Sequence, residues 1–90
     1  MRIDKFLQVS RILKRRSVAK EIIDKGRVSV NNKVAKPGTS LNINDKVEIM
    51  FGDYTIVLKV LKTDEKVKKD EASELYEIIE KRENIQWVLR

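Results

Sequence analysis

The hydrophobic and polar positions of the first 25 residues follow the period of an α-helix. In the segment RIDKFLQVS, apolar side chains three and four residues apart share one face, which predicts a helix over residues 2–10. In VAKEIIDK, two pairs of apolar residues repeat with a four-residue offset, which predicts a second helix over residues 18–25. Ser17 is the expected N-cap of the second helix, and Gly26 is its expected left-handed C-terminal stop.

After Gly26 the period changes to two, which is the period of a β-strand. The segment RVSVNNKVA predicts a β-hairpin, because Asn31 and Asn32 tolerate the positive φ angles of a tight turn. Two more strands are predicted by KVEIMF and YTIVLKVL, which are separated by a Gly-Asp turn. Two helices followed by about three to five short strands are typical of an α+β fold.

The last third of the chain changes character again. Residues 62–74 contain no periodic apolar set, which predicts a solvated linker. The segment ASELYEIIEKR recovers helical spacing, so we expect a C-terminal helix over residues 72–82. Trp87, in the tail that follows, either covers part of the core or stacks on a ligand. The predicted organisation is a binding domain of residues 1–61 and a charged linker, helix and tail in residues 62–90.

The composition excludes several classes of function. The chain contains neither cysteine nor histidine, which removes disulfides, thiolate sites and the Ser-His and Cys-His nucleophile pairs. No apolar run approaches the roughly 20 residues that a membrane span needs. We therefore expect a cytoplasmic protein that is not an enzyme and has no metal or cofactor.

The net charge of +6 is concentrated at the beginning of the chain. Residues 1–36 carry 11 lysines and arginines against three acidic residues, a local net charge of +8. The segment SRILKRRSVAKE alone places five basic residues in twelve positions, interleaved with aliphatic residues that would bury the opposite side. A solvated helix face would be the ordinary interpretation, but acidic partners for salt bridges are scarce here. Uncompensated charge of this kind favours binding of a nucleic acid.

RNA is favoured over DNA as the polyanion. A helix that reads DNA bases exposes Gln, Asn or Arg on its early turns. The segment VAKEIIDK exposes two acidic residues instead, which would face the groove. Recognition of RNA by shape and by its phosphates needs fewer base-reading side chains.

Three segments, MRIDKFL, SRILKRRSVAKEIIDKGRVSVNN and KPGTSLNINDKVEI, resemble the S-four-type RNA-binding domain, named after the fourth small-subunit ribosomal protein. The resemblance covers residues 1–51, and within the family it is strongest to the small heat-shock-type branch and the RqcP-like proteins of bacterial ribosome-associated quality control. It implies two helices packed on a small antiparallel β-sheet, with an RNA-binding ridge formed by the helices and the hairpin. The RNA-binding positions that it implies are Arg2, Lys5, Arg11, Lys14, Arg15, Arg16, Lys20, Asn31 and Asn32.

The resemblance also implies a function. RqcP-like proteins bind rRNA and tRNA on a large ribosomal subunit that carries a stalled peptidyl-tRNA, and they support C-terminal alanine tailing by a larger, RqcH-like partner. We therefore expect a non-catalytic, monomeric RNA-binding factor. Two alternatives stay open, a free-standing RNA-binding accessory of an RNA-modifying enzyme and a ribosome assembly factor.

Individual side chains in the basic segment are expected to differ in importance. Arg11, Arg15 and Arg16 should contribute most, because a guanidinium can donate two hydrogen bonds to one phosphate or stack on an exposed base. Asp4 has two interpretations. It either stabilises the first turn of its helix or orients a neighbouring arginine through a salt bridge.

Overall fold

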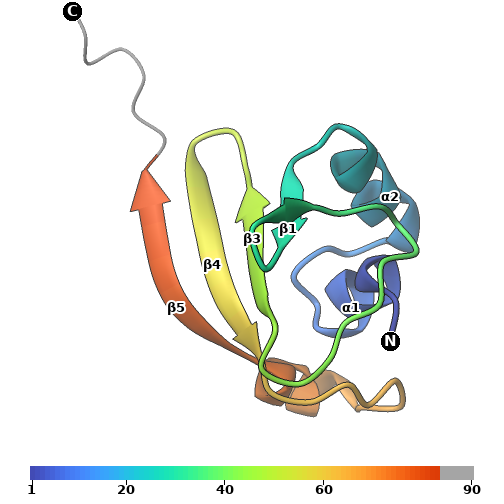
Figure 1. Ribbon diagram of the computed structural model, residues 1–90. Helices are drawn as coiled ribbons and strands as arrows, with labels where there is room; N and C mark the ends of the chain where they lie inside the picture. Colours follow the sequence, from blue (N-terminus) through green and yellow to red (C-terminus); the bar gives the residue numbers. More distant parts are fainter. Residues whose placement is uncertain (84–90) are drawn as a thin grey trace, which may run out of the picture.

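The computed structural model describes residues 1–83 of the chain (Figure 1). In chain order the elements are helices α1 (Ile3–Val9) and α2 (Arg16–Asp24), strands β1 (Val28–Val30), β2 (Lys33–Val34), β3 (Lys46–Met50) and β4 (Tyr54–Val60), the 3-10 helix η1 (Lys69–Leu75) and strand β5 (Tyr76–Glu83). The predicted α+β class, with two N-terminal helices and an antiparallel sheet, is confirmed. None of the helices in the described part of the chain is long and apolar enough to cross a membrane.

The five strands form one antiparallel sheet in the order β2-β1-β3-β4-β5. Because residues paired across an antiparallel ladder point to the same face, the register Val47↔Leu58 aligns apolar side chains on one face. Both helices lie on one side of the sheet (Figure 1). Lys46 and Lys59 are adjacent in sequence to Val47 and Leu58, and they pair with each other on the opposite face of the sheet.

The core lies between the helices and this face of the sheet. The apolar spacing that predicts the first helix is its buried face, since Ile3, Phe6 and Leu7 are completely buried. Ala19 and Ile23 bury the corresponding face of α2. The sheet, the loops and η1 contribute Val28, Val30, Ala35, Leu41, Val47, Ile49, Leu58, Val60 and Leu75. The packed aliphatic side chains therefore fix the direction in which the polar faces of both helices point.

The predicted C-terminal helix is wrong. Residues 69–75 form the 3-10 helix, and residues 76–83 form strand β5, which pairs with β4 from Val60↔Tyr76 to Tyr54↔Glu83. A register shift between Val57 and Leu58 leaves Ile79 without a partner residue. The helical spacing is overridden because β4 is rich in β-branched residues and pairs along its whole length with this segment.

The predicted N-cap of α2 is also wrong. The helix begins at Arg16, and its N-cap is Arg15, which has extended φ and ψ angles and makes no capping bond with its side chain. Ser17 lies inside the first turn. The helix begins two residues before the predicted start at Val18, and Arg16 in its first turn pairs with a buried carboxylate, described below.

The predicted turns are confirmed by their backbone angles. Gly26 ends α2 with φ of 75°, and Asn31 and Asn32 form the hairpin turn with φ of 50° and 73°. Arg11, whose φ is 66°, is a left-handed residue that the sequence did not reveal. Trp87 lies outside the described residues.

Candidate nucleic-acid interface

The basic residues of the first 20 positions come from α1, α2 and the loop between them. Arg2 precedes α1, and Lys5 lies on it. Arg11, Lys14 and Arg15 lie in the loop, and Arg16 and Lys20 lie on α2. The structure divides most of them into two groups. Arg2 and Arg16 meet at Asp4, whereas Lys5, Arg11 and Lys14 contribute to the lining of a surface pocket. Arg15 and Lys20 are exposed and belong to neither group.

Asp4 is a completely buried carboxylate that holds two arginines. Its Oδ2 lies 3.2 Å from Nη2 of Arg2 and 3.3 Å from Nε of Arg16. Its Oδ1 accepts a 2.8 Å hydrogen bond from the backbone N–H of Lys5 and lies 3.5 Å from Nη2 of Arg16. A buried charge is tolerated only when it is paired and hydrogen-bonded in this way. Both interpretations of Asp4 therefore apply, because it bonds the first turn of α1 and also orients arginines.

The charge state of Asp4 follows from these contacts. Burial raises the pKa of the carboxyl, but the hydrogen bond and charge of Arg16, the backbone N–H of Lys5 and the charge of Arg2 outweigh it. The pKa is therefore lowered from its ordinary 3.8. Asp4 stays ionised at neutral pH and keeps both guanidinium groups in place.

The two arginines that Asp4 holds are also partly exposed. The side chain of Arg16 is 39% exposed and that of Arg2 is 50% exposed, so both side chains reach solvent while Asp4 holds them. The backbone of Arg2 is fixed as well, because it forms a β-bridge with Ser40. Two positive charges against one carboxylate leave the group with an excess charge of one.

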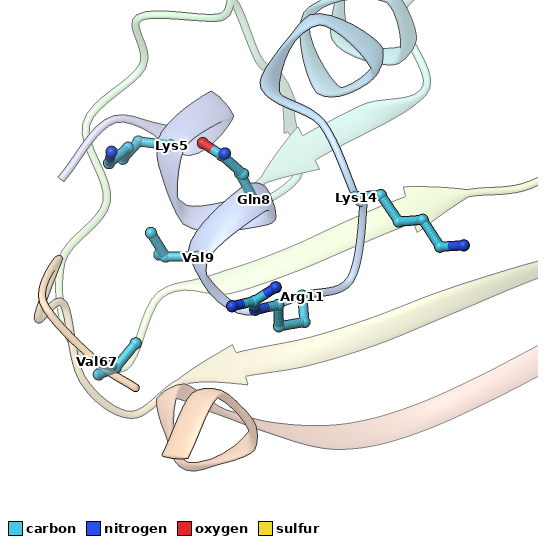
Figure 2. Close-up of a pocket in the computed structure, with 6 residues that line it drawn as sticks. All are labelled: Lys5, Gln8, Val9, Arg11, Lys14 and Val67. Carbon is cyan, nitrogen blue, oxygen red and sulfur yellow. The ribbon is translucent and has the colours of Figure 1, made fainter. Parts of the chain in front are cut away.

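The second group lines a pocket of about 160 Å³ (Figure 2). Its lining residues are Lys5, Gln8 and Val9 from α1, Arg11 and Lys14 from the following loop, and Val67 from the segment after β4. Arg11 and Lys14 also line an adjoining hollow together with Lys69. The ion pairs within residues 1–83 use other cations, so Lys5, Arg11 and Lys14 are uncompensated.

Four of the residues that line the two hollows are absent from the residues predicted to bind RNA: Gln8, Val9, Val67 and Lys69. Gln8 lies on the polar face of α1, where nothing in the sequence distinguishes it. Val67 and Lys69 belong to the segment predicted as a linker, and only the return of the chain to α1 brings them to the pocket. The run of lysines in residues 66–69 is the one sequence signal that could have drawn attention to this segment.

The hairpin turn offers two more candidate residues with different surroundings. The Asn31 amide donates from Nδ2 to Oδ1 of Asp45 at 3.1 Å, and its Oδ1 accepts the backbone N–H of Lys46 at 2.9 Å. Asn31 thus ties the hairpin to the start of β3. Asn32 is exposed at the tip of the turn. An RNA contact by either residue stays a prediction.

The described residues contain no group of three or more Asp, Glu, His or Cys side chains that could hold a metal ion. The arrangement offers cations and amide donors on a rigid support. Its chemistry is the binding of an anion.

Comparison with known proteins identifies the family. Residues 1–47 match the S4 domain. The chain is 54% identical over 79 residues to the RQC P-site tRNA stabilizing factor of Streptococcus pneumoniae, covering 88% of this chain and 90% of that one. It is 40% identical over 79 residues to the Bacillus subtilis protein of the same name, covering 88% and 92%.

More distant relatives share the fold. The chain is 32% identical over 91 residues to heat shock protein 15 of Escherichia coli, covering 94% of this chain and 68% of that one. A solved structure, described as the trimeric structure of Vibrio cholerae heat shock protein 15, matches with a TM-score of 0.78 and 29% identity over 87% of this chain and 80% of that one. The chain belongs to the S4 domain family, in the group that contains the RQC P-site tRNA stabilizing factors.

Proposed function

We propose that this protein is a non-catalytic RNA-binding factor of ribosome-associated quality control. It binds rRNA and tRNA on a large ribosomal subunit that carries a stalled peptidyl-tRNA, and it supports C-terminal alanine tailing of the stalled chain. The observation that carries the proposal is the pair of arginines that the buried Asp4 holds, in a chain 54% identical to an RQC P-site tRNA stabilizing factor.

The geometry suits recognition of an RNA backbone. Lys5, Arg16 and Lys20 lie on helices whose opposite faces are buried, so these cations are presented at fixed positions. The other basic residues lie directly before α1 or in the loop between the two helices. Contacts with phosphates position a protein on folded RNA and supply most of the affinity, without reading bases. Arg2 and Arg16 suit this role because a guanidinium can donate two parallel hydrogen bonds to a phosphate.

The partners follow from the same proposal. The factor acts in the cytoplasm beside a larger, RqcH-like protein that adds the alanines. We propose that it acts as a monomer. Because the Vibrio cholerae structure is described as a trimer, the mass of the purified protein should be measured by light scattering before binding is analysed.

The test is purification of the tagged protein from cells in mild salt, followed by identification of the RNA and peptidyl-tRNA that accompany it. The binding variant is Arg11→Ala/Arg16→Ala. The control is Lys46→Gln/Lys59→Gln, which removes the same number of charges from the face of the sheet that the helices do not cover.

Wild type and the Lys46→Gln/Lys59→Gln control should both recover large subunits with peptidyl-tRNA, and the arginine variant should not. Recovery of precursor particles without peptidyl-tRNA would instead indicate ribosome assembly. A stable complex with an RNA-modifying enzyme would indicate the accessory role. If about six phosphates are contacted, the affinity should also fall with salt at a log-log slope of roughly −4 to −5.

A further inference from the structure

The segment that follows β4 returns to α1 and is anchored there. Val67 is half-buried against the core and lines the same pocket as Val9 of α1 (Figure 2). The 3-10 helix η1 begins two residues later, and its Ala72 and Leu75 are buried. Lys69 therefore stands on backbone that is fixed on both sides, although the sequence places it in an apparent linker.

This return brings Lys69 to the uncompensated cations of the N-terminal loop. Arg11, Lys14 and Lys69 line a hollow of about 510 Å³ that adjoins the smaller pocket lined by Lys5, Arg11 and Lys14. No carboxylate of residues 1–83 lines either hollow. Among residues 1–83, Lys69 takes part in no ion pair or hydrogen bond of its side chain, like the other cations of the two hollows. Like charges gathered without counter-charges repel each other unless an anion joins them.

The backbone of Arg11 gives a second, independent indication. Arg11 follows α1 in the left-handed conformation, with φ of 66°, and its N–H donates to the carbonyl of Gln8 at 3.0 Å. Glycine is the usual residue at such a helix end, and a side chain there costs about 1 kcal/mol. Glycine at position 11 would relieve this backbone strain. A strained backbone at a residue other than glycine is characteristic of positions whose side chain has a function.

We propose that the two hollows form one site for a phosphodiester group of the bound RNA, completed by Lys69. The Arg11 guanidinium donates to the non-bridging oxygens, and Lys14 and Lys69 supply positive charge from two sides. The inference rests on the proposed function and deepens it, because it assigns part of the RNA contact to the segment after β4.

The test compares two single lysine substitutions that change the net charge equally. Lys69→Gln removes the cation that lines the hollow, and Lys66→Gln removes an exposed lysine three residues earlier that lines neither hollow. Binding to purified large ribosomal subunits is measured by co-sedimentation over a series of KCl concentrations. Lys69→Gln should weaken binding about three- to tenfold and reduce the salt slope by about 0.7–0.9, with a change of at most about twofold for Lys66→Gln.

Arg11→Gly separates the side chain from the backbone. It removes the cation and also relieves the left-handed strain, so the melting temperature should stay equal or rise while binding weakens. The double variant Arg11→Gly/Lys69→Gln should lose less affinity than the product of the two single losses, because both cations serve one phosphate.

Two results would overturn the phosphate site while the proposed function stands. One is binding of Lys69→Gln that equals wild type, and the other is an equal loss for Lys66→Gln and Lys69→Gln. Failure of the wild-type protein itself to bind large subunits would refute the proposed function, and the phosphate site with it.

Discussion

Replacement of Asp4 by asparagine would test whether orientation or net charge governs the binding of RNA. Asparagine keeps the shape of the side chain and the oxygen that accepts the N–H of Lys5. It removes the negative charge that holds Arg2 and Arg16, at 3.2 and 3.3 Å. The net charge rises from +6 to +7. Simple attraction to a polyanion would therefore strengthen binding, whereas loss of the oriented arginines would weaken it.

The magnitude for stability follows from the contacts of Asp4. Two charge-assisted contacts are lost, and because the arginine side chains are 50% and 39% exposed, solvent screening reduces each to about 1 kcal/mol. The free energy of unfolding should fall by about 2 kcal/mol. For a domain of this size that corresponds to a decrease in melting temperature of about 10 °C.

The magnitude for binding follows from side-chain entropy. An arginine that is no longer held must be ordered by the RNA, at a cost of about 0.7 kcal/mol for each side chain. The cost for the two arginines together corresponds to an affinity of Asp4→Asn for RNA that is about tenfold weaker than that of wild type. This loss is opposite in sign to the effect of the added positive charge.

The matched control is Asp24→Asn, which makes the same change in charge. Asp24 is exposed at the end of α2 and forms no ion pair among residues 1–83. Melting is followed by circular dichroism at neutral pH, and binding by co-sedimentation with large ribosomal subunits. Equal melting temperatures and equal affinities for Asp4→Asn and Asp24→Asn would refute the role assigned to Asp4.

Three further measurements test the fold and its electrostatics. The pKa of Asp4 in the folded protein is lowered from its ordinary 3.8. Its stabilisation is therefore present above that ordinary value and is lost as the pH falls through the lower folded value. Acid titration of stability should therefore show a loss below about pH 4 in wild type that is smaller in Asp4→Asn. Gly26→Ala should lower the melting temperature by about 4–8 °C through backbone strain at φ of 75°. A steric clash does not contribute, because apart from the adjoining residues no atom of the described chain lies within 4 Å of the added methyl. An unchanged melting temperature would contradict the left-handed helix end. Asn31→Ala should cost about 1 kcal/mol and speed amide exchange at the start of β3, because the bonds to Asp45 and Lys46 are lost. Exchange equal to that of wild type would show that those bonds do not hold the hairpin.

The features that the sequence reveals correctly are those encoded locally. The buried faces of α1 and α2 are visible in the spacing of aliphatic residues, and the hairpin is visible in its paired asparagines. These signals need only residues that are neighbours along the chain.

The features that the sequence does not reveal depend on distant segments. The contact between Arg16 and Asp4 joins residues 12 positions apart and exists only because the two helices pack together. The segment of residues 72–82 has apolar spacing compatible with a helix. It forms a strand over most of its length because it pairs with the edge of β4, which would otherwise be unpaired. Lys69 is exposed, as the sequence predicts for this segment, but its position beside Arg11 and Lys14 depends on the return of the chain to α1 after β4.

Strand β5 also protects the molecule from self-association. Strand β4, with the sequence YTIVLKV, would be the edge of the sheet without it, and an unpaired strand of this composition is a template for aggregation. Strand β5 places five charged residues among its eight positions at that edge, and its irregular register at Ile79 interrupts the ladder. A chain cleaved after Leu75 would expose the backbone donors and acceptors of β4 and become prone to edge-to-edge aggregation.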